Sequence, residues 1–146
     1  MTDRVDVSVA QLIHAPREKL ASFAADPSNA PKWYVNIKSV KWVSEPGTRV
    51  GAQAAFVAEF FGRRLAYTYE ITDYSPDERL VMQTAQGPFP MATIYAWRDA
   101  PGGTEMTMTN RGNPAGFKSV LAPVMAAAMR RAMTRDLAAL ARLMES

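Results

Sequence analysis

The feature of this sequence that most constrains the fold is its C-terminal stretch, Gly116 to Met144, which has the pattern of one long amphipathic helix. A helix this long needs a large partner, because packing of an apolar face supplies most of the stability of a protein helix. We therefore expect the preceding residues to form a curved sheet around it, with space left between the two. At about 100° per residue, the apolar face holds Met125, Met129, Ala132, Met133, Leu137, Leu140, Leu143 and Met144, and the opposite face holds Arg130, Arg131, Arg135 and Arg142.

Asp136 is the exception on the apolar face, with Ala132 and Leu140 one turn away on either side. A buried carboxylate needs a partner, or it stays protonated at a raised pKa. We favour a structural pair that is sealed from any cavity, with Arg64, Arg4 or a tyrosine hydroxyl as the donor. The alternatives are contact with a ligand and a role as general acid or base, which makes Asp136 the one weak catalytic candidate.

Composition excludes several classes of site. The 146 residues include no cysteine, which rules out disulfides, thiolate metal sites and cysteine nucleophiles, and a reducing cytoplasm is the natural compartment. No signal segment and no apolar run near the roughly 18 residues of a membrane span is apparent. The net charge of +3 is mild and lies mostly on the last helix, so nucleic acid is not an expected partner. We expect one ligand-binding domain over residues 1–146.

Alternating apolar and polar residues predict a series of strands upstream of the helix. The first runs from Val5 to about His14, a short helix follows Pro16 up to Asp26, and a second helical turn covers Asn29 to Tyr34. Short turns between the later strands require antiparallel pairing. The predicted fold is α+β, a curved antiparallel sheet of about seven strands. The later strands are expected at Ile37 to Val43, Val50 to Phe60, Arg64 to Thr72, Leu80 to Ala85, Met91 to Arg98 and Thr104 to Arg111.

The order of these elements and four local segments resemble the helix-grip fold of the START-like (SRPBCC) superfamily. The segments are Ile13 to Leu20, Asp26 to Trp33, Asp73 to Leu80 and Gly102 to Thr107. The chain is most similar to the bacterial polyketide cyclase/dehydrase and lipid-transport group of that superfamily. This resemblance implies a deep apolar cavity between sheet and helix, but no particular reaction.

Methionines and aromatic residues are predicted to face the same interior. Flexible thioethers adapt to varied apolar partners, and tyrosine hydroxyls can orient a ligand in an apolar cavity. Ordinary core packing is the competing interpretation. We expect a cavity of at least roughly 300 Å³, capped by Phe89 and by a second lip at Gly112 to Gly116. The candidate ligand-binding residues are Trp33, Phe56, Phe60, Tyr67, Tyr69, Met82, Phe89, Tyr95, Met106, Met108, Met125, Met129 and Met133.

The sequence favours a binding protein, possibly a transporter, for a hydrophobic or amphipathic small molecule, with no cofactor. A polyketide cyclase or dehydratase and a protein-interaction module are the alternatives. With one histidine and no cysteine a metal site is not expected, and His14 is interpreted as a half-exposed strand-end residue. The arginines of the last helix are either solvated or make transient contact with an anionic membrane surface. Pro123 either begins this helix or kinks it.

Overall fold

The computed structural model describes residues 5–60, 62–112 and 122–145, and contains all the strands predicted from the sequence. The strands are β1 (Val5–Ile13), β2 (Ile37–Trp42), β3 (Gln53–Phe60), β4 (Arg63–Ser75), β5 (Arg79–Gln86), β6 (Met91–Ala100) and β7 (Gly103–Gly112). The helices are α1 (Arg17–Ala24), α2 (Ala30–Trp33) and α3 (Ala122–Glu145), with a 3-10 turn at Pro27–Asn29. The α+β helix-grip fold expected from the sequence is confirmed.

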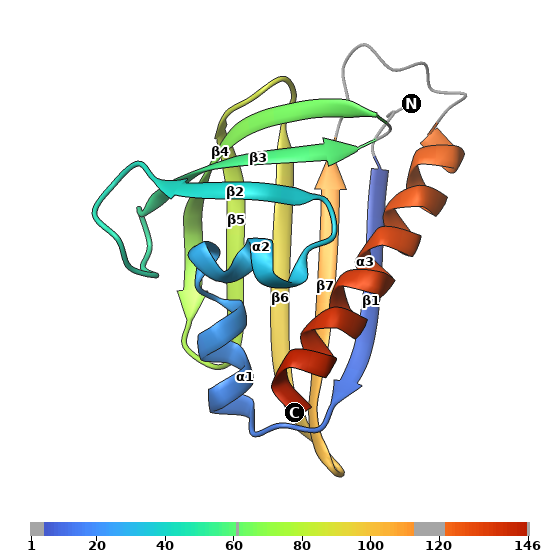
Figure 1. Cartoon of the computed structure of the whole chain (residues 1–146). Helices are drawn as coiled ribbons and strands as arrows, with labels where there is room; N and C mark the ends of the chain where they lie inside the picture. The colour runs from blue at the N-terminus through green and yellow to red at the C-terminus, as the bar shows by residue number, and fades with distance from the viewer. Residues whose placement is uncertain (1–4, 61, 113–121, 146) are drawn as a thin grey trace.

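The seven strands form one antiparallel sheet in the order β1-β7-β6-β5-β4-β3-β2. In Figure 1, β5, β6, β7 and β1 stand upright, whereas β2 and β3 cross the top of the molecule almost at right angles to them. The long strand β4 joins the two parts, and its pairing with β5 shifts register between Thr68 and Tyr69 and again between Ile71 and Asp73. Such bulges bend a strand and increase its twist. The sheet therefore curls around α3.

Two predicted strand boundaries differ from the structure by three residues, and one of them is the end of β4, which continues to Ser75 rather than stopping at Thr72. β3 begins at Gln53 rather than at Val50. Gly51 has a φ of 93°, a conformation that a strand cannot use, and Val50 before it is exposed to solvent. At the other end of β3 the expected hairpin is present, since Gly62 has a φ of 71° between β3 and β4.

Helix α3 lies across the concave face of the sheet beside β1 (Figure 1). Met125, Met133, Leu137 and Leu140 are buried, and the four arginines of the opposite face are exposed, as predicted. Leu143 departs from the prediction, because it is 46% exposed. Leu143 lines an open groove next to α1. Helix α1 covers only part of the last turn of α3, so this side chain stays accessible. Pro123 falls in the first turn of the described helix, and residues 113–121, which include most of the predicted second lip, lie outside the described residues.

The lower half of the interior is a filled core. Trp97, Met106 and Leu140 are almost completely buried there, together with Leu20 from α1. The short helices α1 and α2 close this end of the sheet, and their buried side chains belong to the same hydrophobic cluster as those of the sheet and α3. The pocket that α3 shares with the sheet lies in the upper half, between the first turns of α3 and the curled part of the sheet.

Candidate functional site

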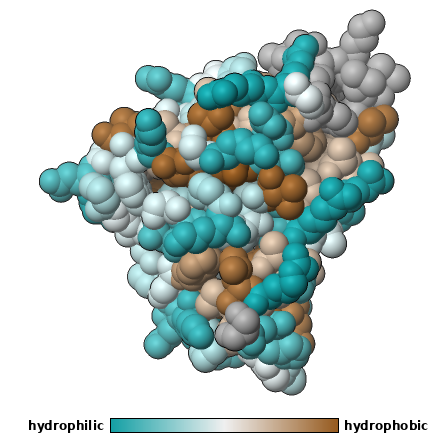
Figure 2. Space-filling view, viewed as in Figure 1, coloured by the Kyte–Doolittle hydropathy of each residue, from teal (hydrophilic) through white to brown (hydrophobic). Residues whose placement is uncertain are grey.

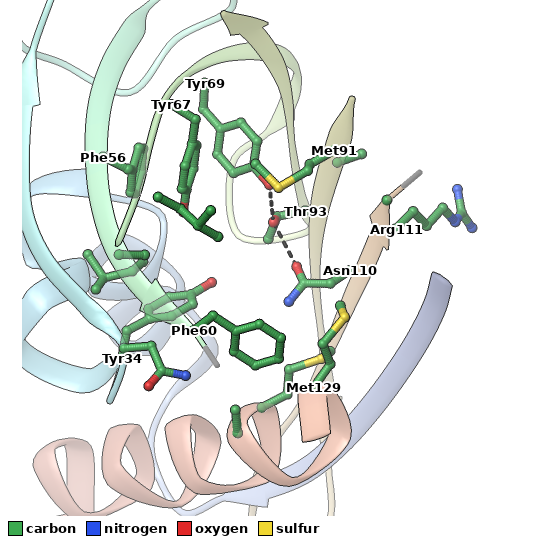
Figure 3. Close-up of a pocket in the computed structure, with 18 of the residues that line it drawn as sticks. Tyr34, Phe56, Phe60, Tyr67, Tyr69, Met91, Thr93, Asn110, Arg111 and Met129 are labelled. Atoms are coloured by element: carbon green, nitrogen blue, oxygen red, sulfur yellow. Dashed lines mark hydrogen bonds between the residues drawn. The ribbon is translucent and has the colours of Figure 1, made fainter. Parts of the chain in front are cut away.

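A cavity of about 160 Å³ lies between the first four turns of α3 and the curled part of the sheet (Figure 3). It is smaller than the roughly 300 Å³ expected for a typical ligand pocket. Figure 3 shows the reason, because the side chains of Phe60 and Met129 project into the space from opposite sides. The described residues on its wall are Val5, Tyr34, Asn36, Ile37, Phe56, Ala58, Phe60, Leu65, Tyr67, Tyr69, Met82, Phe89, Met91, Ala92, Thr93, Asn110, Arg111, Gly112, Met125, Met129, Ala132, Met133 and Asp136.

The aromatic wall of the cavity comes from β3 and β4. Phe56 and Tyr67 are cross-strand partners, and their rings stack with centroids 5.4 Å apart and an angle of 2° between the planes. Tyr69 meets Tyr67 edge-on with centroids 5.0 Å apart. Period-two alternation along β4 places both tyrosines on the inner face. The result is a preformed apolar wall suited to a flat or chain-like ligand.

A chain of hydrogen bonds crosses from this wall to the opposite strands. The hydroxyl of Thr93 donates to Asn110 Oδ1 at 2.7 Å, so the 2.9 Å contact between Tyr69 and Thr93 uses the tyrosine hydroxyl as donor. Burial raises the pKa of Tyr69 to about 12, so this hydroxyl keeps its proton. The amide nitrogen of Asn110 points toward the cavity in Figure 3, and none of the described residues accepts a hydrogen bond from it.

Tyr67 supplies a second polar group. Its hydroxyl points into the cavity (Figure 3) and has no hydrogen-bond partner among the described residues. Burial, followed by the nearby Tyr69 and Tyr95, raises the pKa of Tyr67 well above its ordinary value. Tyr67 is therefore a neutral donor and acceptor, and it and the Asn110 amide offer hydrogen bonds to polar atoms of a ligand at two separate places on the wall.

Asp136 lies on the cavity wall, and the expected side-chain partner is wrong. Its Oδ1 accepts a hydrogen bond from the backbone N–H of Val35 at 2.8 Å, in the segment between α2 and β2. Arg64 is exposed to solvent, and Arg4 lies outside the described residues. Burial raises the pKa of Asp136 from 3.8 to about 6, and the Val35 bond only partly offsets this effect. The carboxyl group thus faces a candidate ligand site and titrates near neutral pH.

A pair of tyrosines lies beside this carboxyl group. The hydroxyls of Tyr34 and Tyr95 form a short hydrogen bond with each other. Burial raises the pKa of both, and the charge of Asp136 adds to the effect. Only Tyr34 reaches the cavity wall, so it separates Tyr95 from any ligand.

Nine of the thirteen predicted ligand-binding residues lie on the cavity wall, and four do not. Trp33, Tyr95, Met106 and Met108 are at most 2% exposed and belong to the core. Tyr95, Met106 and Met108 share the inner face of the sheet with the wall residues but lie lower, where α2, which carries Trp33, and the second half of α3 fill the space. The nine on the wall are Phe56, Phe60, Tyr67, Tyr69, Met82, Phe89, Met125, Met129 and Met133.

The sequence interpretation missed several wall residues, above all Thr93 and Asn110. Both continue an inward-facing series that the sequence displays, Thr93 before Tyr95 and Trp97, and Asn110 after Met106 and Met108. Polar residues at such inward positions were the available signal. Tyr34 had no periodic signal, because it follows α2 in an irregular segment.

Metal and histidine chemistry gain no support from the described residues, where no three carboxylate or imidazole groups gather closely enough to hold a metal ion. His14 directly follows β1 and is exposed, rather than half-exposed as expected, and its Nδ1 lies 3.0 Å from the carbonyl oxygen of Gly102. None of the helices in the described ranges is long and apolar enough to span a membrane.

Comparison with solved structures places the fold among known proteins. TTHA0849 from Thermus thermophilus is 18% identical, with a TM-score of 0.81 and 94% of each chain covered. The Zhui aromatase/cyclase from Streptomyces sp. R1128 is 14% identical, with a TM-score of 0.80 over 97% of this chain and 94% of that one. Ginseng major latex-like protein 151 from Panax ginseng is 11% identical, with a TM-score of 0.65 over 90% and 97%. At these identities the likeness shows the fold alone.

Comparison with protein families gives the broader assignment. No match was found among curated proteins. A family model described as polyketide cyclase / dehydrase and lipid transport matches residues 4–145. Since the match spans almost the whole sequence, the chain belongs to this family of the START-like superfamily.

Proposed function

We propose that the protein binds a hydrophobic or amphipathic small molecule in the cavity between α3 and the curled sheet. The observation that carries the proposal is the meeting of apolar walls with two polar groups, the Tyr67 hydroxyl and the Asn110 amide, that lack partners in the described protein. Ligand sites typically combine a mostly apolar lining with a few oriented polar groups. Neither polar atom is sealed off, because the buried side-chain nitrogen and oxygen atoms without a partner in the described residues are Trp33 Nε1 and Trp97 Nε1. Both groups are therefore accessible to a ligand that enters the cavity.

The ligand class follows from the walls and from the size of the cavity. Stacked rings on one side and methionines on the other suit an aromatic, polyketide-like, quinone or acyl ligand. The family description and the aromatase/cyclase with the same fold support this class. A volume of about 160 Å³ favours a small ligand. A larger one requires Phe60 and Met129 to change rotamer, which their partial exposure allows.

A cyclase or dehydratase is the second candidate, and Asp136 is the observation that favours it. A carboxyl group with a pKa of about 6 at a cavity wall can give or take a proton at neutral pH. In that case the cavity folds and desolvates the substrate. Transport of the ligand, a cytoplasmic location and the lack of a nucleic-acid partner stay predictions.

Filling the cavity tests the binding proposal. Ala58 is buried on its wall between the inward positions of Phe56 and Phe60. Ala58→Phe places a ring in the site, so we expect it to weaken binding of the neutral fluorescent probe phenylnaphthylamine by about tenfold or more. Each factor of ten corresponds to about 1.4 kcal/mol of binding free energy. Fluorescence titration of the folded protein measures the affinity.

Ala66→Phe is the matched control, since Ala66 lies on the exposed face of the neighbouring strand β4. It is expected to leave the probe affinity unchanged. Equal effects of the two variants, or wild-type binding that appears only in partly unfolded protein, would contradict the proposal.

Removing the free hydroxyl tests how a ligand is oriented. Tyr67→Phe keeps the stacked ring and deletes only the oxygen. Affinity for naphthol is expected to fall about twofold to tenfold, the effect of one hydrogen bond worth roughly 0.5–1.5 kcal/mol. Naphthalene has no polar atom, so its affinity should be the same for both proteins. A loss for naphthalene as large as that for naphthol would mean that the variant changes packing instead.

A further inference from the structure

A second, charged groove adjoins the cavity between α3 and the hairpin of β3 and β4. One side consists of Asn36, just before β2, and of Glu59, Phe60 and Gly62 at the hairpin. The other side is a strip of α3, on which Ala128 and Ala132 form one row, and Arg131 and Arg135 form the next. Each row has a spacing of four residues, which places successive side chains about one helical turn apart on the same face.

The groove and the cavity share part of their walls. Asn36, Phe60 and Ala132 line both. Ala132 has a small side chain, and the ring of Phe60 projects from the hairpin toward α3 (Figure 3). A molecule in the cavity can therefore extend past Phe60 into the groove, where the surroundings change from apolar to charged.

Arg131 and Arg135 are the two arginines that line this groove. Within the described ranges, neither guanidinium group has an acidic partner or a hydrogen bond. Their neighbour Arg130, on the other flank of α3, is engaged, because it donates to the carbonyl oxygen of Ser8 at 2.9 Å. The carboxylate of Glu59 lies within 4.0 Å of Lys38, so its charge is met outside α3. Figure 2 shows hydrophilic side chains along α3 at the right, next to apolar atoms in the upper half of the same face.

We propose that this groove holds the acidic group of an amphipathic ligand whose apolar part occupies the cavity. Two guanidinium groups one turn apart can donate to the oxygens of one carboxylate or phosphate monoester, while Asn36 offers an amide at the junction. The inference rests on the proposed function, and it narrows the ligand to an acid with an apolar body.

The size of the effect follows from the exposure of the two arginines. Exposed ion pairs contribute little individually, and salt screens them. Two such contacts to one acid amount to about a tenfold change in affinity. The effect should shrink as the salt concentration rises.

The test compares matched ligands and matched variants. Decanoate, decyl phosphate and decanol compete with phenylnaphthylamine for the wild-type protein, for the double variant Arg131→Gln/Arg135→Gln and for Arg142→Gln. Arg142 is exposed on the same helix, eleven residues after Arg131 and hence on the same side of it, but does not line the groove. The double variant is expected to weaken both acids about tenfold at low salt and to leave decanol within about twofold. Arg142→Gln should leave all three unchanged.

The outcomes separate this inference from the proposed function. If phenylnaphthylamine does not bind the wild type, the cavity proposal fails and the inference fails with it. If the probe binds but the acids behave like decanol in every protein, only the inference is overturned. Displacement of decanoate by inorganic phosphate alone would show a site for free anions, and would overturn it too. A membrane role for the arginines would also overturn the inference. In that case the double variant would no longer sediment with phosphatidylglycerol vesicles, while its affinity for decanoate would be unchanged.

Discussion

Leu140→Ala is expected to lower the free energy of unfolding by about 2–5 kcal/mol. Leu140 is completely buried in the lower half of the interior, where α3 meets the sheet and the two short helices. Replacing it removes buried apolar surface and leaves a hole that close-packed neighbours fill only in part. Reversible chemical denaturation, followed by tryptophan fluorescence, measures the loss.

Leu143→Ala is the matched control, because it makes the same chemical change three residues later on the same helix. Leu143 is 46% exposed, so its truncation should cost about 1 kcal/mol or less. A loss below about 0.5 kcal/mol for Leu140→Ala, or equal losses for the two variants, would mean that α3 is not fixed by its apolar face.

The fold could be predicted because its signals are periodic and local. Period-two alternation indicated every strand, and the turn residues between strands required antiparallel neighbours. The stripe of α3 indicated which face is buried. The exceptions, Val50 and Leu143, lie where an element ends, and there the outcome depends on a turn or on a neighbouring helix that alternation does not describe.

The cavity wall was harder to predict than the inner face of the sheet. Met106, Met108 and Asn110 occupy successive inward positions of β7, yet only Asn110 reaches the cavity. Alternation tells which face of the sheet a side chain takes. Whether an inward-facing side chain then lines the cavity or packs in the core depends on where α3 crosses the sheet and where β4 bends. Those are long-range features. The same limit explains Asp136, whose partner is the backbone N–H of Val35, a group that every residue except proline carries.

Because Asp136 is bound by a backbone amide and not by a basic side chain, Asp136→Asn is expected to raise the stability of the protein rather than lower it. A broken pair with a basic residue would lower stability, but the partner is a backbone amide, to which an asparagine oxygen can bind equally well. The charge itself is then the costly feature. Burial raises the folded-state pKa from 3.8 to about 6, so the native protein holds the proton more tightly than the unfolded chain does.

The sign of the pH dependence follows directly. The protonated carboxyl group contributes its full stability below about pH 4, and this contribution disappears as the pH rises through 6. A shift of this size corresponds to about 3 kcal/mol at pH 8 at most. Asp136→Asn removes the dependence, so its stability relative to wild type should rise by about 1–3 kcal/mol between pH 4 and pH 8. Denaturation curves of both proteins at the two pH values measure this difference.

Ligand binding and turnover then separate the two candidate functions. In a binding protein, Asp136→Asn should leave the affinity for phenylnaphthylamine nearly unchanged, since the amide keeps the shape of the wall and the Val35 contact. In a cyclase or dehydratase, turnover of a polyketide-like substrate should fall by roughly 10²-fold or more, as expected for loss of a positioned acid or base. A variant that is less stable than wild type at pH 8 but not at pH 4 would contradict the raised pKa of Asp136 and with it the acid–base role, because it would mean that the charged carboxylate is favourable where it lies.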